Sequence, residues 1–383
     1  MSKLNTFLTG VKVLDLSQYI PGPMASLYLA DMGAEVLKIE PPQGDPMRQL
    51  GPRDAQGESV FHRALNGGKS IRHMNLKDPA ERDALLAMLP DFDVLIEGFR
   101  PGVMARLGLS YEIVSQINPR LIFCAISGYG ARGALAQQPA HDGNYLATSG
   151  IMHRNGSDAP VFYDPPVSDV AGSLFAATAI LGALYRRQTD GQGCHIDLGL
   201  ADVAMPIQML QIAAWGADGT NPSRRETYLN GGAAFYNIYA TRDGSYVMLG
   251  AVEPKFWANF CRFAERPEWL GRQNETMPQT RLIDDLAAYF AAHDLNAIVD
   301  RFAAAECCLS PVYDLNEALS QSHLAERDLV RRGQDGDLQA LFPVLVDGIR
   351  PLSRSAPENQ PTSCSPTRSF QQTSLSHMRF PCH

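Results

Sequence analysis

Short β-rich runs alternate with amphipathic helical stretches over roughly the first 130 residues, and this alternation most constrains the fold. The apolar runs 11–16, 35–39, 94–97 and 121–127 are typical of strands, and 24–32 is typical of a helix. Strands alternating with helices predict βαβ units and therefore an α/β fold with a Rossmann-like parallel sheet. Ligands of such folds gather at the carboxyl ends of the strands.

The length of 383 residues favours two domains. A buried helix at 171–187 and a strand at 195–198 end the large domain, and a hairpin turned by Asp243-Gly244 at 235–250 opens a smaller α+β domain. Helices at 254–263, 280–292, 295–305 and 315–321, with a strand at 310–313, continue it. The predicted division is a large domain at 1–205, a linker at 206–229, a small domain at 230–325, a return segment at 326–352 and a tail at 353–383. The tail is rich in Ser, Pro, Thr and Gln, and we expect it to be disordered or loosely packed, without a role in chemistry.

The formal net charge of −8 argues against broad nucleic-acid binding, but leaves room for a local basic pocket for one anionic ligand. The seven cysteines are scattered without C-x-x-C spacing, which predicts reduced thiols and no structural zinc. No H-x-x-x-H pair occurs, so no metal is expected. The longest apolar stretch, 173–185, is too short to span a bilayer, so we expect a cytoplasmic protein without a membrane partner.

Three common nucleotide and hydrolase motifs are absent from the sequence. The stretch 65–70 resembles the end of a phosphate-binding P-loop, but Arg63 stands where its first glycine is required. No G-x-G-x-x-G follows the first predicted strand, and no G-x-S-x-G occurs. A nucleoside triphosphatase, a dinucleotide oxidoreductase and a common serine hydrolase are therefore disfavoured.

Two positions are candidates for catalytic residues, and each also has a purely structural interpretation. His141-Asp142 lies in a Gly- and Pro-containing loop, 128–150, where it could face a cleft or only solvent. Asp169 lies between Pro165-Pro166 and the buried helix, where an N-cap role is the plain interpretation.

Three further charged residues flank strand-to-helix junctions. Glu253 precedes Pro254, where a carboxylate favours the helix start electrostatically. Arg100 and Arg106 flank Pro101-Gly102 after a strand, and guanidinium groups suit phosphates, although most surface arginines bind nothing specific.

In their order along residues 8 to 350, these segments resemble the family III CoA-transferase (CaiB/BaiF) superfamily, and within it the α-methylacyl-CoA racemase branch. The stretches that carry the resemblance are Val13-Leu-Asp-Leu-Ser17, Gly22-Pro23, 33–40, Gly68-Lys69-Ser70, 97–102, Arg106-Leu107-Gly108, Gly128-Tyr129-Gly130, His141-Asp142 and 251–257. The resemblance implies that the chain returns from the small domain to the large domain and ends there in a helical segment. The Ser/Pro/Thr/Gln tail of this sequence differs from that pattern.

The resemblance also implies roles for the matching residues. Transferases of this superfamily use the aspartate that matches Asp169 as a covalent nucleophile, whereas racemases keep it and add a His-Asp pair and a glutamate. His141 would then act on one face of the α-carbon, oriented by Glu253, and Asp169 on the other, with Asp142 and Tyr145 near the thioester. The positions that match CoA contacts are Ile20, Met74, Lys77, Phe99, Arg100 and Arg106.

The predicted activity is therefore interconversion of (2R)- and (2S)-2-methylacyl-CoA esters, with no cofactor beyond the CoA moiety of the substrate. The resemblance implies an interlocked homodimer, with each site between the large domain of one chain and the small domain of its partner. Two alternatives stay open: a CoA-transferase working through Asp169, and a non-catalytic acyl-CoA-binding protein. The acyl group remains open among branched fatty, sterol and aryl-propionyl chains.

Overall fold

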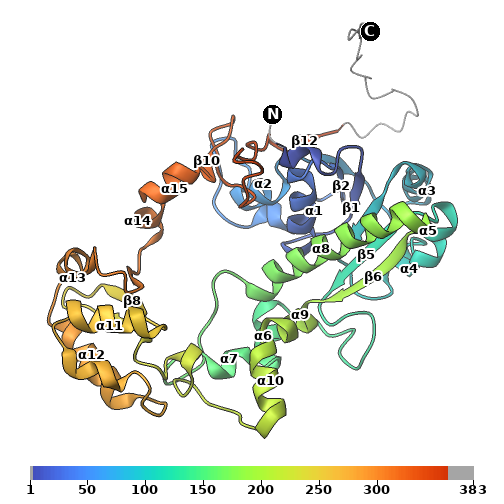
Figure 1. The fold of residues 1–383 in the computed structure, drawn as a ribbon. Coiled ribbons are helices and arrows are strands. Elements are labelled where there is room, and N and C mark those ends of the chain that lie inside the picture. The colour runs from blue at the N-terminus through green and yellow to red at the C-terminus, as the bar shows by residue number, and fades with distance from the viewer. Residues whose placement is uncertain (1–2, 361–383) are drawn as a thin grey trace, which may run out of the picture.

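A seven-stranded sheet forms the centre of the larger domain in the computed structural model, which describes residues 3–360 (Figure 1). The strand order is β12-β3-β2-β1-β4-β5-β6, and all neighbouring pairs are parallel. The predicted α/β fold with a parallel sheet is confirmed. The strands are β1 (Lys12–Asp15), β2 (Glu35–Glu40), β3 (Ser70–His73), β4 (Val94–Glu97), β5 (Ile122–Ser127), β6 (Cys194–Gly199) and β12 (Glu358–Asn359).

The central strands send alternate side chains into two hydrophobic cores, one on each face of the sheet. Val13 and Ile96 lie in the core beneath α1 and α8, whereas Leu14 and Leu95 lie in the core covered by α3, α4 and α5. This period of two is what a strand buried on both faces requires. The helices of this domain are α1 (Pro21–Asp31), α2 (Val60–Asn66), α3 (Pro79–Met88), α4 (Val103–Arg106), α5 (Tyr111–Ile117), α6 (Asp142–Thr148), α7 (Ile151–Arg154), α8 (Val167–Asp190), α9 (Leu200–Ile207) and α10 (Met209–Asp218).

Helix α8 is longer than the predicted 171–187 and begins at Val167. Among the described helices it alone is long and apolar enough to cross a membrane by length and composition. It packs against α1, α9, β5 and β6, as the core helix of a globular domain does. Gly191, in a left-handed conformation with φ of 71°, ends the helix.

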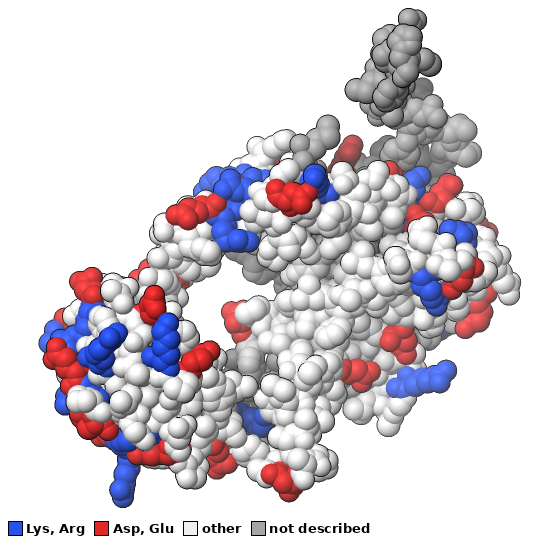
Figure 2. Space-filling model, viewed as in Figure 1, with Lys and Arg blue, Asp and Glu red and all other residues white. Residues whose placement is uncertain are grey.

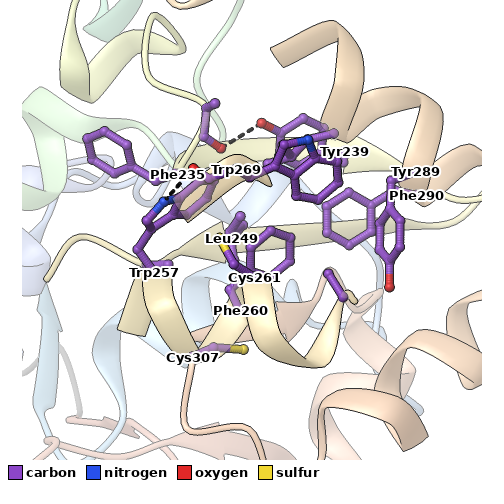
Figure 3. Close-up of a cluster of buried hydrophobic side chains, with 14 of the residues drawn as sticks. Phe235, Tyr239, Leu249, Trp257, Phe260, Cys261, Trp269, Tyr289, Phe290 and Cys307 are labelled. Carbon is purple, nitrogen blue, oxygen red and sulfur yellow. Dashed lines mark hydrogen bonds between the residues drawn. The ribbon is translucent and has the colours of Figure 1, made fainter. Parts of the chain in front are cut away.

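The smaller domain is built on an aromatic core around a three-stranded antiparallel sheet (Figure 3). Phe260 stacks on Trp257 with ring centroids 5.5 Å apart, and also on Phe302 at 5.4 Å. The Trp257 indole N–H donates to the carbonyl of Trp269 at 3.2 Å, which satisfies its buried polar group. The predicted hairpin is confirmed. The elements are β7 (Tyr236–Ala240), β8 (Tyr246–Gly250), α11 (Pro254–Phe263), α12 (Thr280–Ala291), α13 (Leu295–Phe302), β9 (Leu309–Pro311) and α14 (Leu315–Leu319).

The two segments between the predicted domains contain regular structure. Helix α10 occupies Met209–Asp218 within the predicted linker 206–229. Helix α15 (Ser322–Arg327) and the hairpin of β10 (Val330–Arg332) and β11 (Leu338–Ala340) lead back to the large domain. Short 3-10 helices occupy Leu4–Thr6, Pro46–Gln49, Leu89–Asp91, Tyr228–Asn230 and Pro267–Arg272.

The start of the predicted tail is ordered, which corrects the expectation for residues 353–360. Strand β12 pairs in parallel with β3, and Arg354 binds the Asp31 carboxylate through two nitrogens at 2.7 Å each. The guanidinium is 10% exposed and the carboxylate 6%. A bidentate, nearly dry pair anchors the chain despite its polar composition. The remainder of the predicted tail, 361–383, lies outside the described residues.

We expect Arg354→Met to lower the free energy of unfolding by about 3 kcal/mol, because the substitution leaves Asp31 buried without its cation. Urea denaturation measures the change. Lys3→Met is the matched control, since the Lys3–Asp347 pair is exposed and its loss should cost no more than about 0.5 kcal/mol. Equal losses in the two variants would contradict this role of the return segment.

Candidate active site

The strand order reverses direction beside β1, and a cavity of 470 Å³ opens at that place. The chain goes from β1 to β2 and β3 on one side, and later from β4 to β5 and β6 on the other. The loops that follow β1 and β4 therefore part, which is where open parallel sheets bind their ligands. The cavity is lined by residues after β1 (18, 19) and β4 (98–101), by the end of β5 and the residue after it (126–128), and by 138–141 and the starts of α6 and α8.

His141 lies at the edge of this cavity, as the residue directly before α6. Its backbone N–H donates to Asn144 Oδ1 at 3.0 Å, and its carbonyl accepts from the Asn144 N–H at 2.8 Å. These reciprocal bonds satisfy groups that a helix start leaves free and hold the His141 backbone in an extended conformation. The imidazole is exposed to the cavity, which fits a cleft-facing residue better than a core histidine.

Asp169 also lines the cavity, from the first turn of α8. The expectation that it is the N-cap of this helix was wrong. Pro166 holds that position, and the Asp142 carboxylate instead accepts the N–H groups of Ser168 and Asp169, at 2.6 and 3.1 Å. The cap comes from another helix, so no local pattern in the sequence could reveal it. The Asp169 carboxylate is thereby left free to face the cavity.

Burial, together with the smaller effect of the neighbouring Asp142 carboxylate, raises the pKa of Asp169 to about 7. Both effects disfavour the charged form, the first by removing water and the second by repulsion of like charges. The negative charge of the Asp142 carboxylate is stabilised by two helix N–H groups, whereas the Asp169 carboxylate has no such donors among the described residues. A carboxyl with this pKa exchanges protons readily near neutral pH.

Tyr145 forms part of the wall between these two acids. Its hydroxyl donates to the carbonyl of Ala140 at 3.1 Å, and burial raises the pKa of Tyr145 to about 12, with Asp169 adding to the shift. Only a glycine fits at 128, since a Cβ there would lie 2.7 Å from the Tyr145 hydroxyl oxygen. Gly128 thus permits close packing at the cavity wall.

Glu97, the last residue of β4, is a buried carboxyl that the sequence reasoning left without a role. It accepts the N–H of Phe99 at 2.7 Å, and burial raises the pKa of Glu97 to about 7. The bond orients the loop that carries Phe99 and Arg100 along the cavity. The position of Glu97 in the sequence could have indicated a role at the site, because the last residue of a central parallel strand lies at the edge of the sheet where ligands bind.

The residues predicted to contact CoA separate into two groups. Phe99 and Arg100 line the cavity with His141, Tyr145 and Asp169. Ile20, Met74, Lys77 and Arg106 do not line it: Met74 packs in the core of one sheet face, and Lys77 and Arg106 are exposed on the surface.

Glu253 lies apart from the cavity in the same chain. It is the exposed N-cap of α11 in the small domain, and among residues 3–360 no hydrogen bond or ion pair joins it to His141. The two domains stand apart in this region (Figure 1).

Comparison with known proteins decides the family. The model of CoA-transferase family III matches residues 8–367. The chain belongs to CoA-transferase family III. The resemblance stated from the sequence is thereby confirmed at the level of the family, and the match extends into the atypical tail.

Relatives in CoA-transferase family III carry both activities. An acetyl-CoA:oxalate CoA-transferase of Acetobacter aceti is 34% identical, covering 88% of this chain and 89% of its own. A human α-methylacyl-CoA racemase is 30% identical, covering 86% and 84%. A CaiB/BaiF family protein from Brucella suis has a similar structure, with a TM-score of 0.81 at 25% identity over 92% of this chain and 96% of that one.

The raised pKa of Asp169 predicts a pH-dependent effect on stability. Its folded value, about 7, exceeds the ordinary 3.8, so the stabilisation by the neutral form is complete below 3.8 and lost as the pH rises to 7. The asparagine of Asp169→Asn stays neutral at every pH. The melting temperature of the variant minus that of the wild type should therefore increase between pH 4 and 7 and stay constant above pH 7. Differential scanning calorimetry at stepped pH measures this difference.

Asp218→Asn provides a control of opposite sign. Hydrogen bonds from the Thr220 hydroxyl and N–H lower the pKa of Asp218, so the wild type gains from ionisation as the pH rises. A melting-temperature difference for Asp169→Asn that stays constant with pH would contradict the raised pKa.

Proposed function

We propose that this protein is an isomerase that interconverts (2R)- and (2S)-2-methylacyl-CoA thioesters. The observation that carries the proposal is that His141 and Asp169 line one cavity, while burial gives Asp169 a pKa of about 7. An imidazole and a carboxyl that face one cavity supply two acid/base groups of different kinds, which is what inversion of a carbon acid requires.

The reaction follows from the acidity of the substrate. An α-proton next to a thioester is weakly acidic, so its removal needs a positioned base and donors for the developing enolate oxygen. One group, ionised Asp169 or neutral His141, takes the proton from one face of the α-carbon. The other group, in its protonated form, returns a proton to the opposite face and so inverts the centre. The pair then exchanges roles for the reverse reaction.

A nucleophilic role places a different demand on Asp169. A carboxylate that attacks a thioester must be ionised, and a raised pKa reduces the ionised fraction at neutral pH. A proton-transfer role benefits from the same shift. The electrostatics of the Asp142–Asp169 pair therefore favour the isomerase.

The CoA moiety is assigned to the large domain. Arg100 and Phe99 at the cavity offer a guanidinium for a phosphate and an aromatic ring for the ligand. We propose that Ile20, Lys77 and Arg106 extend this contact along the carboxyl edge of β1, β3 and β4 and on α4, and that Asp142 and Tyr145 flank the thioester. Met74 is buried in the core, so its predicted role is reduced to supporting this edge from beneath. The proposal uses no cofactor beyond the CoA of the substrate.

We propose that Glu253 orients His141 across a dimer interface. Within one chain the glutamate is exposed and apart from the cavity. The small domain is joined to the large one by two segments that border an opening in the molecule (Figure 2). Helix α10 leaves Met209, Leu210 and Trp215 at least 60% exposed, and few charged side chains cover this surface in Figure 2. An apolar face of this kind supports an interface between copies of the chain.

A CoA-transferase is the second candidate, favoured by the 34% identity to the Acetobacter aceti enzyme. In that reaction the Asp169 carboxylate attacks the thioester carbonyl and expels CoA thiolate, which leaves an acyl anhydride. The thiolate then attacks the aspartyl carbonyl, releases the carboxylic acid and leaves a CoA thioester on Asp169. A second carboxylic acid accepts the CoA.

We expect the wild type to exchange the α-proton of a 2-methylacyl-CoA for deuterium in heavy water, with loss of stereochemistry. His141→Ala and Asp169→Ala should each lower the rate by at least about 100-fold, because each removes the acid/base group for one face. Proton NMR of the substrate follows the exchange. Asp158→Ala, on an exposed loop, is the control and should keep the wild-type rate.

Mass spectrometry of the same protein, incubated with an acyl-CoA and an acceptor acid, distinguishes the second candidate. A CoA adduct on Asp169 without deuterium uptake would replace the isomerase by the transferase. A folded protein that binds the ester and does neither would point to a binding protein.

The proposed homodimer predicts a mass twice that of the chain in sedimentation equilibrium. Trp215→Glu on α10 should shift the protein toward the monomer, because it buries a charge in an apolar interface. Ile113→Glu on α5, where the two exposed apolar side chains Ile113 and Ile117 are only 39% and 40% exposed, is the control and should leave the mass unchanged. A monomeric wild type would contradict the proposed assembly and the role of Glu253 across it.

A further inference from the structure

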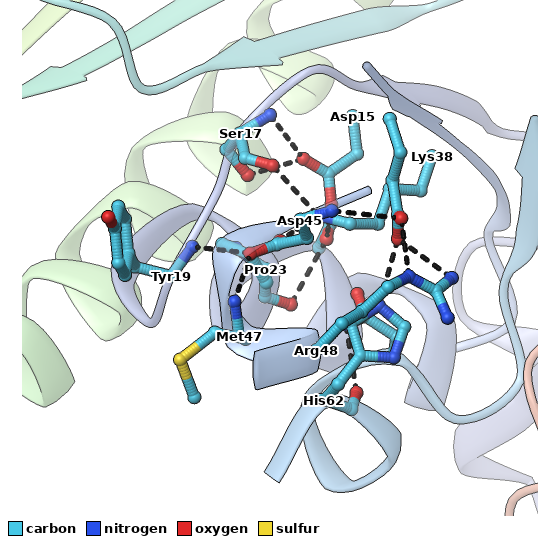
Figure 4. Close-up of polar contacts among 12 residues, drawn as sticks. Asp15, Ser17, Tyr19, Pro23, Lys38, Asp45, Met47, Arg48 and His62 are labelled. Carbon is cyan, nitrogen blue, oxygen red and sulfur yellow. Dashed lines mark hydrogen bonds and ion pairs between the residues drawn. The ribbon is translucent and has the colours of Figure 1, made fainter. Parts of the chain in front are cut away.

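Two fully buried lysines lie beneath the carboxyl ends of β1 and β2, in a polar cluster that the proposed chemistry does not use (Figure 4). Lys38 and Lys69 are 0% and 1% exposed. Asp15, Asp45 and Glu40 supply the opposite charges at equally buried positions. Removing this many charges from water is costly, so the cluster needs a reason beyond filling space.

Lys38 connects β2 to the chain that leaves β1. Its ammonium donates to the carbonyl of Ser17 at 2.7 Å and lies 3.0 Å from the Asp45 carboxylate. Asp45 in turn accepts the N–H of Tyr19 at 3.4 Å and that of Met47 at 2.9 Å. The lysine and the aspartate together hold both peptide groups that flank Gln18.

The held segment is strained and faces the cavity. Tyr19 has a φ of 63°, in the left-handed region that residues with a Cβ rarely adopt. Gln18 and Tyr19 line the cavity with Gly98 and Phe99 of the β4 loop. A strained turn at a ligand site persists only where its surroundings fix it, and the polar contacts of Lys38 and Asp45 supply that constraint.

Neither charged partner lines the cavity itself, so neither is in a position to touch a ligand there. A pair that served stability alone could be replaced by apolar side chains with little loss. Apolar side chains could not bind a carbonyl oxygen and an amide N–H two residues apart. The pair therefore acts on the conformation of the turn.

We propose that Lys38 and Asp45 are positioning residues of the acyl-CoA site, which fix the turn 17–20 so that its cavity side receives the ligand. This inference rests on the proposed binding of a CoA ester. Binding should depend on the pair more than turnover does, because the turn packs against the CoA-contacting loop: a Cβ at Gly98 would lie 3.4 Å from the Ser17 Cβ. No hydrogen bond among residues 3–360 joins the turn to His141 or Asp169.

The test compares Lys38→Met, Asp45→Asn and the double variant with the wild type. Each single variant should weaken CoA-ester binding by about 10-fold in calorimetry and raise KM similarly, with kcat changed less than about threefold. The double variant, which carries no unpaired buried charge, should fold and show about the same loss as one single variant, because the pair acts as a unit.

Arg187→Met is the matched control. Arg187 is a buried cation that also holds a carboxylate, Asp93 at 2.7 Å, and two backbone carbonyls, but at the opposite edge of the sheet. It should lower the melting temperature without changing the dissociation constant. Hydrogen exchange of the peptide spanning 16–22 should accelerate in Lys38→Met and stay unchanged in Arg187→Met.

The outcomes separate the two proposals. Wild-type affinity in the folded double variant, or unchanged exchange over 16–22, overturns the positioning role while leaving acyl-CoA binding intact. A wild type that binds no CoA ester refutes the proposed function, and the positioning role for that ligand falls with it.

Discussion

The reversal of strand order beside β1 is the constraint on which the site depends. Parallel strands end at one edge, and only where successive crossovers turn to opposite sides do the loops at that edge part. Here β1 is paired with β2 and β4, and the loops after β1 and β4 border the cavity. The strand order of the sheet thus also determines where a ligand can enter. The loops that part beside β1 carry the polar groups that face the cavity.

The buried carboxylates at this edge differ in whether a cation or helix N–H groups lie beside them. The Asp142 carboxylate accepts hydrogen bonds from the N–H groups at the start of α8, and Lys38 and Lys69 form ion pairs with Asp45 and Asp15. Asp169 and Glu97 receive no cation of this kind among the described residues, and burial raises the pKa of each to about 7. Compensated carboxylates build the scaffold, whereas the uncompensated ones face proton exchange. Two aspartates that lie 27 positions apart in the chain, Asp142 and Asp169, therefore serve different purposes at one cavity.

The sequence predicted elements with strong local patterns and missed those stabilised from a distance. The strand 94–97 and the helix 254–263 have the predicted bounds, because an apolar run and a proline at the helix start are local signals. Strand β3 was missed because Ser70-Ile-Arg-His alternates poorly, and β12 because its polar composition is offset by pairing with β3. At the site, His141, Tyr145, Asp169, Phe99 and Arg100 meet as a family resemblance implied, but the capping by Asp142 depends on residues 26 apart. Only folding brings such partners together.

The return of the chain through Arg354 and β12 to the sheet has a topological consequence. The N-terminal strands and the last described strand belong to one sheet, so the small domain is inserted in the large one and connected to it at both of its ends. Its aromatic core is complete in itself and requires no side chain from its host. Such an insert can diverge, or be exchanged between relatives, while the host domain keeps its sheet and the cavity at the carboxyl edge. Sequence variation within such a lineage can then accumulate in the insert without rebuilding the parallel sheet of the host domain.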